Sequence, residues 1–145
     1  MKPMAAAHQP ETSARRVLIA DDRPRTRRAL SAVLATCRGL ELVGEAADGE
    51  EAVEVVERLR PDIVVIDVRM PRMDGITATM RIKARWPWIR VVAHSLAEEL
   101  RADALAAGAD AFVPKGAPVR ELFEALQPSS CDRADADVRR SSRYS

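Results

Sequence analysis

The sequence has few cysteines, no long apolar run and almost no net charge. Its two cysteines, Cys37 and Cys131, are too few and too far apart for a disulfide framework or a cysteine-based metal site. A cytoplasmic location is therefore expected. No apolar run exceeds four residues, which argues against a transmembrane helix and against a membrane partner. Residues 1–14 lack the apolar segment of a secretory signal.

The net charge of +1 provides no overall field that would attract nucleic acid. Four arginines lie close together, at positions 23, 25, 27 and 28, but they have no aromatic neighbours. We interpret them as a solvated face or a partner-docking surface, and we expect no direct nucleic acid binding by this segment.

What is present is enough for one ordinary domain. The chain has 145 residues, of which 47% are hydrophobic, so it can bury a core of its own. We expect the folded body to cover residues 15–127. Residues 1–14 and 128–145 are polar and lack an apolar period, which is typical of disordered tails or, at the C-terminal side, of a truncated linker.

Short apolar runs alternate with amphipathic stretches throughout this body. The runs predict strands at 17–20, 40–46, 63–66, 91–93 and 111–113. Apolar residues at i, i+3, i+4 and i+7 predict the helices between and after them, with weaker stripes at 76–85 and 97–107. This alternation indicates an α/β fold, a parallel sheet with helices on both faces. The polar run at 40–46 is typical of an edge strand.

Several strands end in residues that carry chemistry. The first is followed by Asp21 and Asp22, the third by Asp67 and the fifth by Lys115, whereas the fourth ends near Ser95. In parallel sheets, ligands bind beyond the carboxyl ends of the strands. Three carboxylates there repel one another, by about 4 kcal/mol per pair at 4 Å and an effective dielectric near 20. Such an all-oxygen site is suited to Mg²⁺ or Mn²⁺ and not to zinc.

These residue types together fit phosphoryl transfer. Asp67 is a candidate nucleophile that would attack phosphorus and form an acyl phosphate. A divalent cation would allow the carboxylate to approach the phosphoryl group, because it neutralises charge on both. Lys115 would pair with the phosphoryl oxygens, and the Ser95 hydroxyl would donate a hydrogen bond to them.

The motifs resemble the receiver domain of bacterial two-component response regulators. The residues concerned are DD at 21–22, D-V-R-M-P-R-M-D-G at 67–75, Ser95 and F-V-P-K at 112–115. The resemblance covers about residues 15–127, and LVGEAADGEEAVE, DVRMPRMDGI and PKGAPVRELFEAL are most similar to the NarL/LuxR-type subgroup. It implies a flavodoxin-like (βα)5 three-layer sandwich with a five-strand sheet in the order 2-1-3-4-5.

The resemblance also implies roles for individual residues. Asp67 would accept phosphate from a sensor histidine kinase. Asp22 and Asp67 would bind Mg²⁺ (or Mn²⁺) through their side chains, Arg69 through its backbone carbonyl and Asp21 through water. Catalysis would be limited to the domain's own phosphorylation and dephosphorylation, so an enzyme acting on other substrates is not expected.

Two further residues would read out phosphorylation. Ser95 stands at the Thr/Ser switch position and Phe112 at the aromatic switch position. The resemblance allows a homodimer of the phosphorylated form. In NarL/LuxR-type regulators a DNA-binding helix-turn-helix domain normally follows, but only about 18 residues follow the last predicted helix. We expect either a single-domain regulator or part of a transcriptional one.

Each site residue also has a structural interpretation. Asp21 and Asp22 would suit a helix N-cap, since Asp precedes Arg-Pro, and Ser95 would suit a cap of the next helix. Phe112 would serve as core packing. We interpret His94 as a partly exposed strand-end residue and not as a phosphorelay site. The Trp86-Pro87-Trp88 segment is expected to pack at a corner of the fold, with an exposed contact site as the alternative.

Other functions of the same fold remain open at this stage. An aspartyl-phosphate phosphohydrolase usually has a second Asp two residues after the nucleophile, where this chain has Arg69. A flavin carrier would need hydroxyls and backbone amides after the first strand, where this chain has D-D-R-P-R. A phosphorylation-independent interaction module is the main alternative to the switch.

Overall fold

The computed structural model describes residues 14–126. The expectations for residues 1–13 and 127–145, including Cys131, lie outside the described residues. The strands and helices of the described part, with one short 3-10 helix η2, are β1 (Arg15–Ala20), α2 (Pro24–Ala35), β2 (Leu40–Ala46), α3 (Gly49–Leu59), β3 (Ile63–Ile66), α4 (Gly75–Arg85), β4 (Arg90–Ser95), η2 (Glu98–Leu100), α5 (Arg101–Ala106), β5 (Ala111–Pro114) and α6 (Val119–Leu126).

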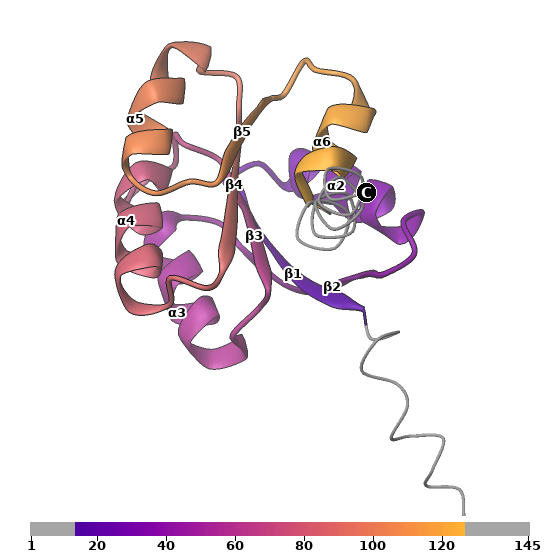
Figure 1. Cartoon of the computed structure of the whole chain (residues 1–145), viewed down its shortest axis with the longest axis horizontal. Coiled ribbons are helices and arrows are strands. Elements are labelled where there is room, and N and C mark those ends of the chain that lie inside the picture. Colours follow the sequence, from indigo (N-terminus) through magenta and orange to yellow (C-terminus); the bar gives the residue numbers. More distant parts are fainter. Residues whose placement is uncertain (1–13, 127–145) are drawn as a thin grey trace, which may run out of the picture.

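The five strands form one parallel sheet in the order β2-β1-β3-β4-β5. Figure 1 shows the three layers: α3, α4 and α5 cover one face of the sheet, and α2 and α6 cover the other. The predicted α/β fold, its flavodoxin-like architecture and its strand order are therefore confirmed. The predicted helix at 97–107 is divided into η2 and α5, in keeping with its weak apolar stripe.

The central strand β3 shows why the sheet is buried on both sides. Val64 and Ile66 belong to the core beneath α3, α4 and α5, whereas Ile63 and Val65 belong to the core beneath α2 and α6. All four are at most 2% exposed, and burying each such side chain stabilises the fold by about 1.5–3 kcal/mol. The predicted edge strand β2 is only partly buried.

The start of α3 is held by its own capping residues. The Asp48 carboxylate accepts a hydrogen bond from the Glu51 backbone N–H at 2.8 Å, as expected of an N-cap. The Glu51 carboxylate in turn accepts from the Ala47 N–H at 2.8 Å. Arg72, from the loop after β3, reaches the buried Asp48 carboxylate at 2.9 Å, so the cap also anchors that loop.

Two glycines allow the loop after β3 to pass close to two helix starts. The Gly49 N–H donates to the Met73 carbonyl at 2.9 Å, and the Gly75 N–H donates to the Val68 carbonyl at 2.7 Å. A Cβ atom on Gly75 would overlap the carbonyl oxygen of Asp67, and one on Gly49 would overlap that of Met73. Glycine at these positions therefore fixes the path of the chain just after Asp67.

Within residues 14–126, no helix combines the length and the apolar character that crossing a bilayer requires.

Candidate functional site

The backbone hydrogen bonds of the sheet continue past the strand ends and set the site residues in register. The Asp21 N–H donates to Ala46 at 3.0 Å, and the Asp67 N–H donates to Ala20 at 2.9 Å. The Lys115 N–H donates to the Ser95 carbonyl at 3.0 Å. The polar residues predicted at the strand ends are therefore brought to one edge of the sheet.

Three carboxylates gather at this edge. Ligand oxygens of Asp21, Asp22 and Asp67 all lie within 4.8 Å of one another. Asp21 is 1% exposed and Asp67 is 7% exposed, whereas Asp22 is exposed. Charges this close and this poorly solvated repel strongly, so the cluster requires positive charge beside it.

Lys115 supplies part of that charge. Its ammonium nitrogen lies 2.8 Å from the Asp21 carboxylate and 2.9 Å from the Asp67 carboxylate. Burial disfavours the charged amine, but hydrogen bonds to Asp21 and Asp67 outweigh burial and raise the pKa of Lys115. One ammonium cannot neutralise three carboxylates, and the remaining all-oxygen donor set fits a hard divalent cation such as Mg²⁺.

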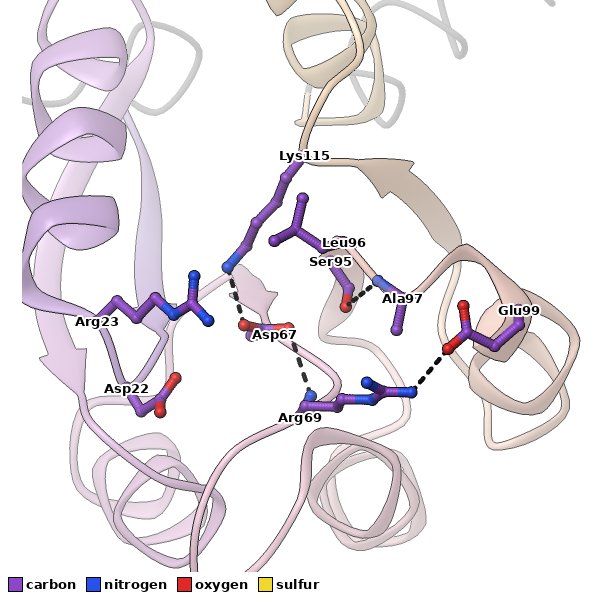
Figure 2. A pocket seen from close by; sticks show the side chains of 9 residues that line it. All are labelled: Asp22, Arg23, Asp67, Arg69, Ser95, Leu96, Ala97, Glu99 and Lys115. Atoms are coloured by element: carbon purple, nitrogen blue, oxygen red, sulfur yellow. Dashed lines mark hydrogen bonds and ion pairs between the residues drawn. The ribbon is translucent and has the colours of Figure 1, made fainter.

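Asp67 faces a cavity of ≈ 340 Å³, seen from close by in Figure 2. Arg69, two residues further along the chain, donates its backbone N–H to one Asp67 carboxylate oxygen at 3.3 Å. Lys115 binds the other oxygen, so both carboxylate oxygens are oriented. The cavity is lined by Asp22, Arg23, Asp67, Arg69, Ser95, Leu96, Ala97, Glu99 and Lys115. Its wall therefore carries three acidic and three basic side chains, with the acidic residues Asp22 and Asp67 next to Lys115.

The comparison with known families agrees with this geometry. Residues 17–127 match the response regulator receiver domain. The chain belongs to this family. Its members are phosphoacceptor switches, and the predicted resemblance is confirmed.

The curated relatives of this receiver include a methylesterase/glutaminase and a response regulator. It is 44% identical over 128 residues to "Protein-glutamate methylesterase/protein-glutamine glutaminase 4" of Myxococcus xanthus, covering 86% of this chain and 33% of the relative. It is 38% identical over 114 residues to "Response regulator GacA" of Pseudomonas viridiflava, covering 77% and 53%. The chain thus spans about a third to a half of the length of these curated relatives.

Among solved structures, the receiver resembles a two-component response regulator of the LuxR family from Aurantimonas sp. SI85-9A1. The TM-score is 0.75 at 31% identity, and the match covers 79% of this chain and 84% of that one. This agrees with the predicted likeness to the NarL/LuxR-type subgroup.

The two predicted switch residues of the receiver lie in different surroundings. Ser95 is buried and lines the cavity, and its hydroxyl oxygen accepts the Ala97 N–H at 3.1 Å. Phe112 does not line the cavity but is packed in the core on the α5 side. The Arg101 guanidinium lies 4.8 Å from the Phe112 ring centre, so Phe112 is coupled to α5.

The alternative interpretation of Asp21 and Asp22 as helix caps is wrong. Helix α2 has Arg23 as its N-cap, and no side chain caps it. The Asp21 carboxylate instead accepts the Arg23 backbone N–H at 2.9 Å. Pro24 at the first helical position has the φ that a helix start requires and lacks an N–H that would otherwise stay unbonded there.

Two charged residues of the cavity wall, Arg23 and Glu99, are not among the predicted site residues. Arg23, which the sequence places on a solvated face or a partner-docking surface, is exposed and also lines the cavity. Glu99 was assigned no role, but its carboxylate pairs with the Arg69 guanidinium at 2.7 Å across the cavity mouth (Figure 2). The available signal was the position of Arg23 directly after Asp22, at the same edge of the sheet.

The expectation of a partly exposed His94 is wrong. The residue is only 9% exposed, and its Nδ1 atom is buried with no hydrogen-bond partner among the described residues. Burial, assisted by the nearby charge of Lys115, lowers the pKa of His94 to about 4. Side chains alternate along β4, so His94 lies on the α2 and α6 face, where it lines a groove of ≈ 370 Å³.

The two tryptophans of the Trp86-Pro87-Trp88 segment differ in burial. Trp86 is 3% exposed, and the guanidinium groups of Arg85 and Arg60 lie 4.5 and 5.2 Å from its ring centre. Trp88 is 70% exposed. The predicted corner packing therefore applies to the first tryptophan and not to the second.

Proposed function

We propose that Asp67 accepts a phosphoryl group from a sensor histidine kinase, and that the receiver then changes its binding surface. The observation that carries this proposal is the position of the Asp67 carboxylate. It is buried at the end of β3, bonded to Lys115 at 2.9 Å, next to two further carboxylates and open to the cavity.

In this proposal the acidic cluster holds Mg²⁺ (or Mn²⁺). Asp22 and Asp67 would bind it through their side chains, Arg69 through its backbone carbonyl and Asp21 through water. The ion would supply charge neutralisation between the carboxylates and the incoming phosphoryl group. The donor set supports this, because hard divalent cations prefer carboxylate and carbonyl oxygens.

Three residues of the receiver have separate roles in the phosphoryl transfer. A carboxylate oxygen of Asp67 attacks phosphorus and forms the new P–O bond. The P–N bond of the donor's phosphohistidine breaks, and the ring nitrogen keeps the electron pair. Lys115 remains charged and follows the phosphoryl oxygens as a point charge. The Ser95 hydroxyl accepts a hydrogen bond from Ala97, so its own proton is free to be donated to the phosphoryl group.

The readout begins at Ser95 and ends at the surface. Movement of Ser95 towards the phosphoryl group would shift the segment leading into η2 and α5. Phe112 would then repack, and Arg101, which is stacked on it, would move with α5. Phosphorylation need only bias two existing arrangements; a change from 1:99 to 99:1 takes about 5.5 kcal/mol.

The wider role belongs to the same proposal. A receiver body at 15–127 between tails at 1–14 and 128–145 would act in the cytoplasm without turning over other substrates. It would bind neither nucleic acid nor membrane itself. The similarity to a LuxR-family response regulator supports an output in transcription through a further segment or a partner. Homodimerisation of the phosphorylated form is a further part of this proposal.

Intact-mass spectrometry tests the proposal. The wild-type chain, incubated with Mg²⁺ and a small phosphodonor, is expected to gain the mass of one phosphoryl group, and Asp67→Asn is expected to gain none. The matched control is Asp62→Asn, since Asp62 accepts a backbone N–H from Arg16 at the opposite end of the sheet. Equal phosphorylation of Asp67→Asn and the wild type would contradict the proposal.

A further inference from the structure

The cations of the Asp67 cavity differ in how they are paired. Lys115 is bound to Asp21 and Asp67, and Arg69 is bound to Glu99. The Arg23 side chain lines the same cavity, but within residues 14–126 its guanidinium makes no hydrogen bond or ion pair. It is therefore the one cavity cation whose charge is uncommitted in this part of the chain.

The base of the Arg23 side chain is fixed while its tip is free. Its backbone N–H donates to the Asp21 carboxylate at 2.9 Å, its carbonyl accepts from Arg27 at 3.1 Å, and Pro24 follows as the first residue of α2. From this anchored position the side chain extends over the cavity on the side opposite Arg69, with its guanidinium directed towards Lys115 and Asp67 (Figure 2).

The chemistry of a guanidinium at this place is specific. An incoming phosphoryl group carries two negative charges, and Lys115 offers one compact positive charge. The planar fork of Arg binds two phosphate oxygens at once, which a lysine cannot do. Besides Lys115 and the proposed divalent ion, Arg23 is the remaining cavity residue placed to add positive charge, since Arg69 is already paired with Glu99 at 2.7 Å.

We propose that Arg23 binds the phosphoryl group of the incoming donor, so that Arg23 and Lys115 together form the donor site. This inference rests on the proposed function of Asp67. The ligand class is a small acyl phosphate or the equivalent phosphoryl group of a protein donor, and a space of ≈ 340 Å³ accommodates the former. In the transfer from an acyl phosphate, the bond between phosphorus and the acyl oxygen breaks, and that oxygen leaves with the electron pair as a carboxylate. The Asp67–phosphorus bond forms, and Arg23 keeps its proton throughout.

Phosphorylation by acetyl phosphate at saturating Mg²⁺ tests the role of Arg23. Initial rates are measured over a series of donor concentrations for the wild type, Arg23→Ala, Arg23→Lys and Arg25→Ala. Arg25 is the matched control, because it is the next arginine of the same helix start but lines the groove between α2 and α6.

The half-saturating donor concentration of Arg23→Ala is expected to rise about fivefold, the loss of one solvent-accessible charge pair, with little change in the maximal rate. The half-saturating donor concentration of Arg23→Lys should lie between those of the wild type and Arg23→Ala. Lysine keeps the positive charge but cannot bind two phosphate oxygens at once. Arg25→Ala should match the wild type. An unchanged half-saturating concentration in Arg23→Ala, or an equal rise in Arg25→Ala, would overturn the proposal.

Calorimetric titration with beryllofluoride and Mg²⁺ gives a second readout that needs no turnover. Beryllofluoride is a stand-in for the phosphoryl group, so Arg23→Ala is expected to bind it about fivefold more weakly than the wild type does. If the wild type is neither phosphorylated nor binds beryllofluoride, the proposed function of Asp67 fails, and this inference with it. If both occur and Arg23→Ala equals the wild type in both, only the inference fails.

Discussion

Two lysines make similar ion pairs at opposite ends of the sheet. Lys83 lies 3.0 Å from Asp110 at the amino ends of the strands, and Lys115 lies 2.9 Å from Asp67 at their carboxyl ends. Their lengths alone do not distinguish a structural pair from a functional one. What distinguishes them is the rest of each ammonium group's surroundings.

The Lys83 ammonium has a complete set of structural partners. Besides Asp110, it donates to the backbone carbonyls of Pro87 and Ile89, at 3.2 and 2.8 Å. The Asp110 carboxylate also accepts the Val91 N–H at 2.8 Å. Three donor directions are used and one carboxylate is neutralised, so this pair joins α4 to the segments that precede β4 and β5.

Lys115, by contrast, is outnumbered by carboxylates. It bonds to Asp21 as well as Asp67, and Asp22 lies within 4.8 Å of both. Lys115 and Asp67 line one cavity together. Lys83 also lines a groove, but Asp110 does not, and the Lys83 pair is the more exposed of the two, at 19% and 32% against 11% and 8%. The surplus of negative charge beside the cavity, and not accessibility alone, therefore distinguishes the functional end.

The largest effect that separates the two ends is expected from removing each lysine. Lys115→Ala should slow phosphorylation of Asp67 by about a hundredfold or more, because a preorganised charge next to the transferring group is lost. Lys83→Ala should leave that rate within about twofold but lower the free energy of unfolding by about 2 kcal/mol, the cost of unmade hydrogen bonds. Phosphorylation rates and denaturant unfolding measure the two. Equal loss of phosphorylation in both variants would contradict the comparison.

The Lys115 end also contains His94, whose buried ring makes stability depend on pH. The pKa of His94 in the folded chain, about 4, lies below the ordinary histidine pKa of 6.5, so the unfolded chain binds more protons between these values. Its contribution is complete above pH 6.5 and is lost as the pH falls, by about 3 kcal/mol at pH 4. Denaturant unfolding at pH 7 and pH 4 measures this.

His94→Gln provides the comparison for that measurement, since glutamine does not titrate while the carboxylates titrate in both proteins. The variant should lose about 3 kcal/mol less than the wild type between the two pH values. Identical losses would show that His94 is not held in its neutral form.

Stabilisation of the domain by Mg²⁺ should depend on residues at the Lys115 end of the sheet and not on residues at the Lys83 end. At a concentration a hundred times its dissociation constant, the ion is expected to raise the free energy of unfolding by about 2.7 kcal/mol. Asp22→Asn should remove most of this gain, whereas Asp62→Asn, at the Lys83 end, should retain it. Thermal unfolding with and without Mg²⁺ measures the effect, and an undiminished gain in Asp22→Asn would remove Asp22 from the metal site.

The parts of this fold that could be predicted depend on local pattern. The all-apolar run at 63–66 indicated a strand buried on both faces, and parallel strands necessarily bring their carboxyl ends to one edge. Asp67 and Lys115 could therefore be expected to meet, although they are far apart in the chain. Asp48 and Glu51 were predictable as caps because capping depends only on neighbours.

What could not be predicted depends on distant packing. The burial of His94 requires knowing how closely α2 and α6 cover its face of the sheet. The Arg69–Glu99 pair joins two loops whose approach no local pattern specifies. Trp86 is buried and Trp88 is exposed because only Trp86 lies against the arginines at the ends of α3 and α4. That contact depends on how the two helices pack. For the same reason Arg23 appeared to be an ordinary surface arginine.

The most direct test of the central claim is to locate the phosphoryl group. Borohydride reduces an aspartyl phosphate to homoserine, and peptide mass spectrometry of the phosphorylated, reduced chain then identifies the modified position. The account predicts homoserine at position 67, and none at Asp21 or Asp22. Homoserine at another aspartate of a fully phosphorylated chain, with Asp67 unmodified, would contradict it.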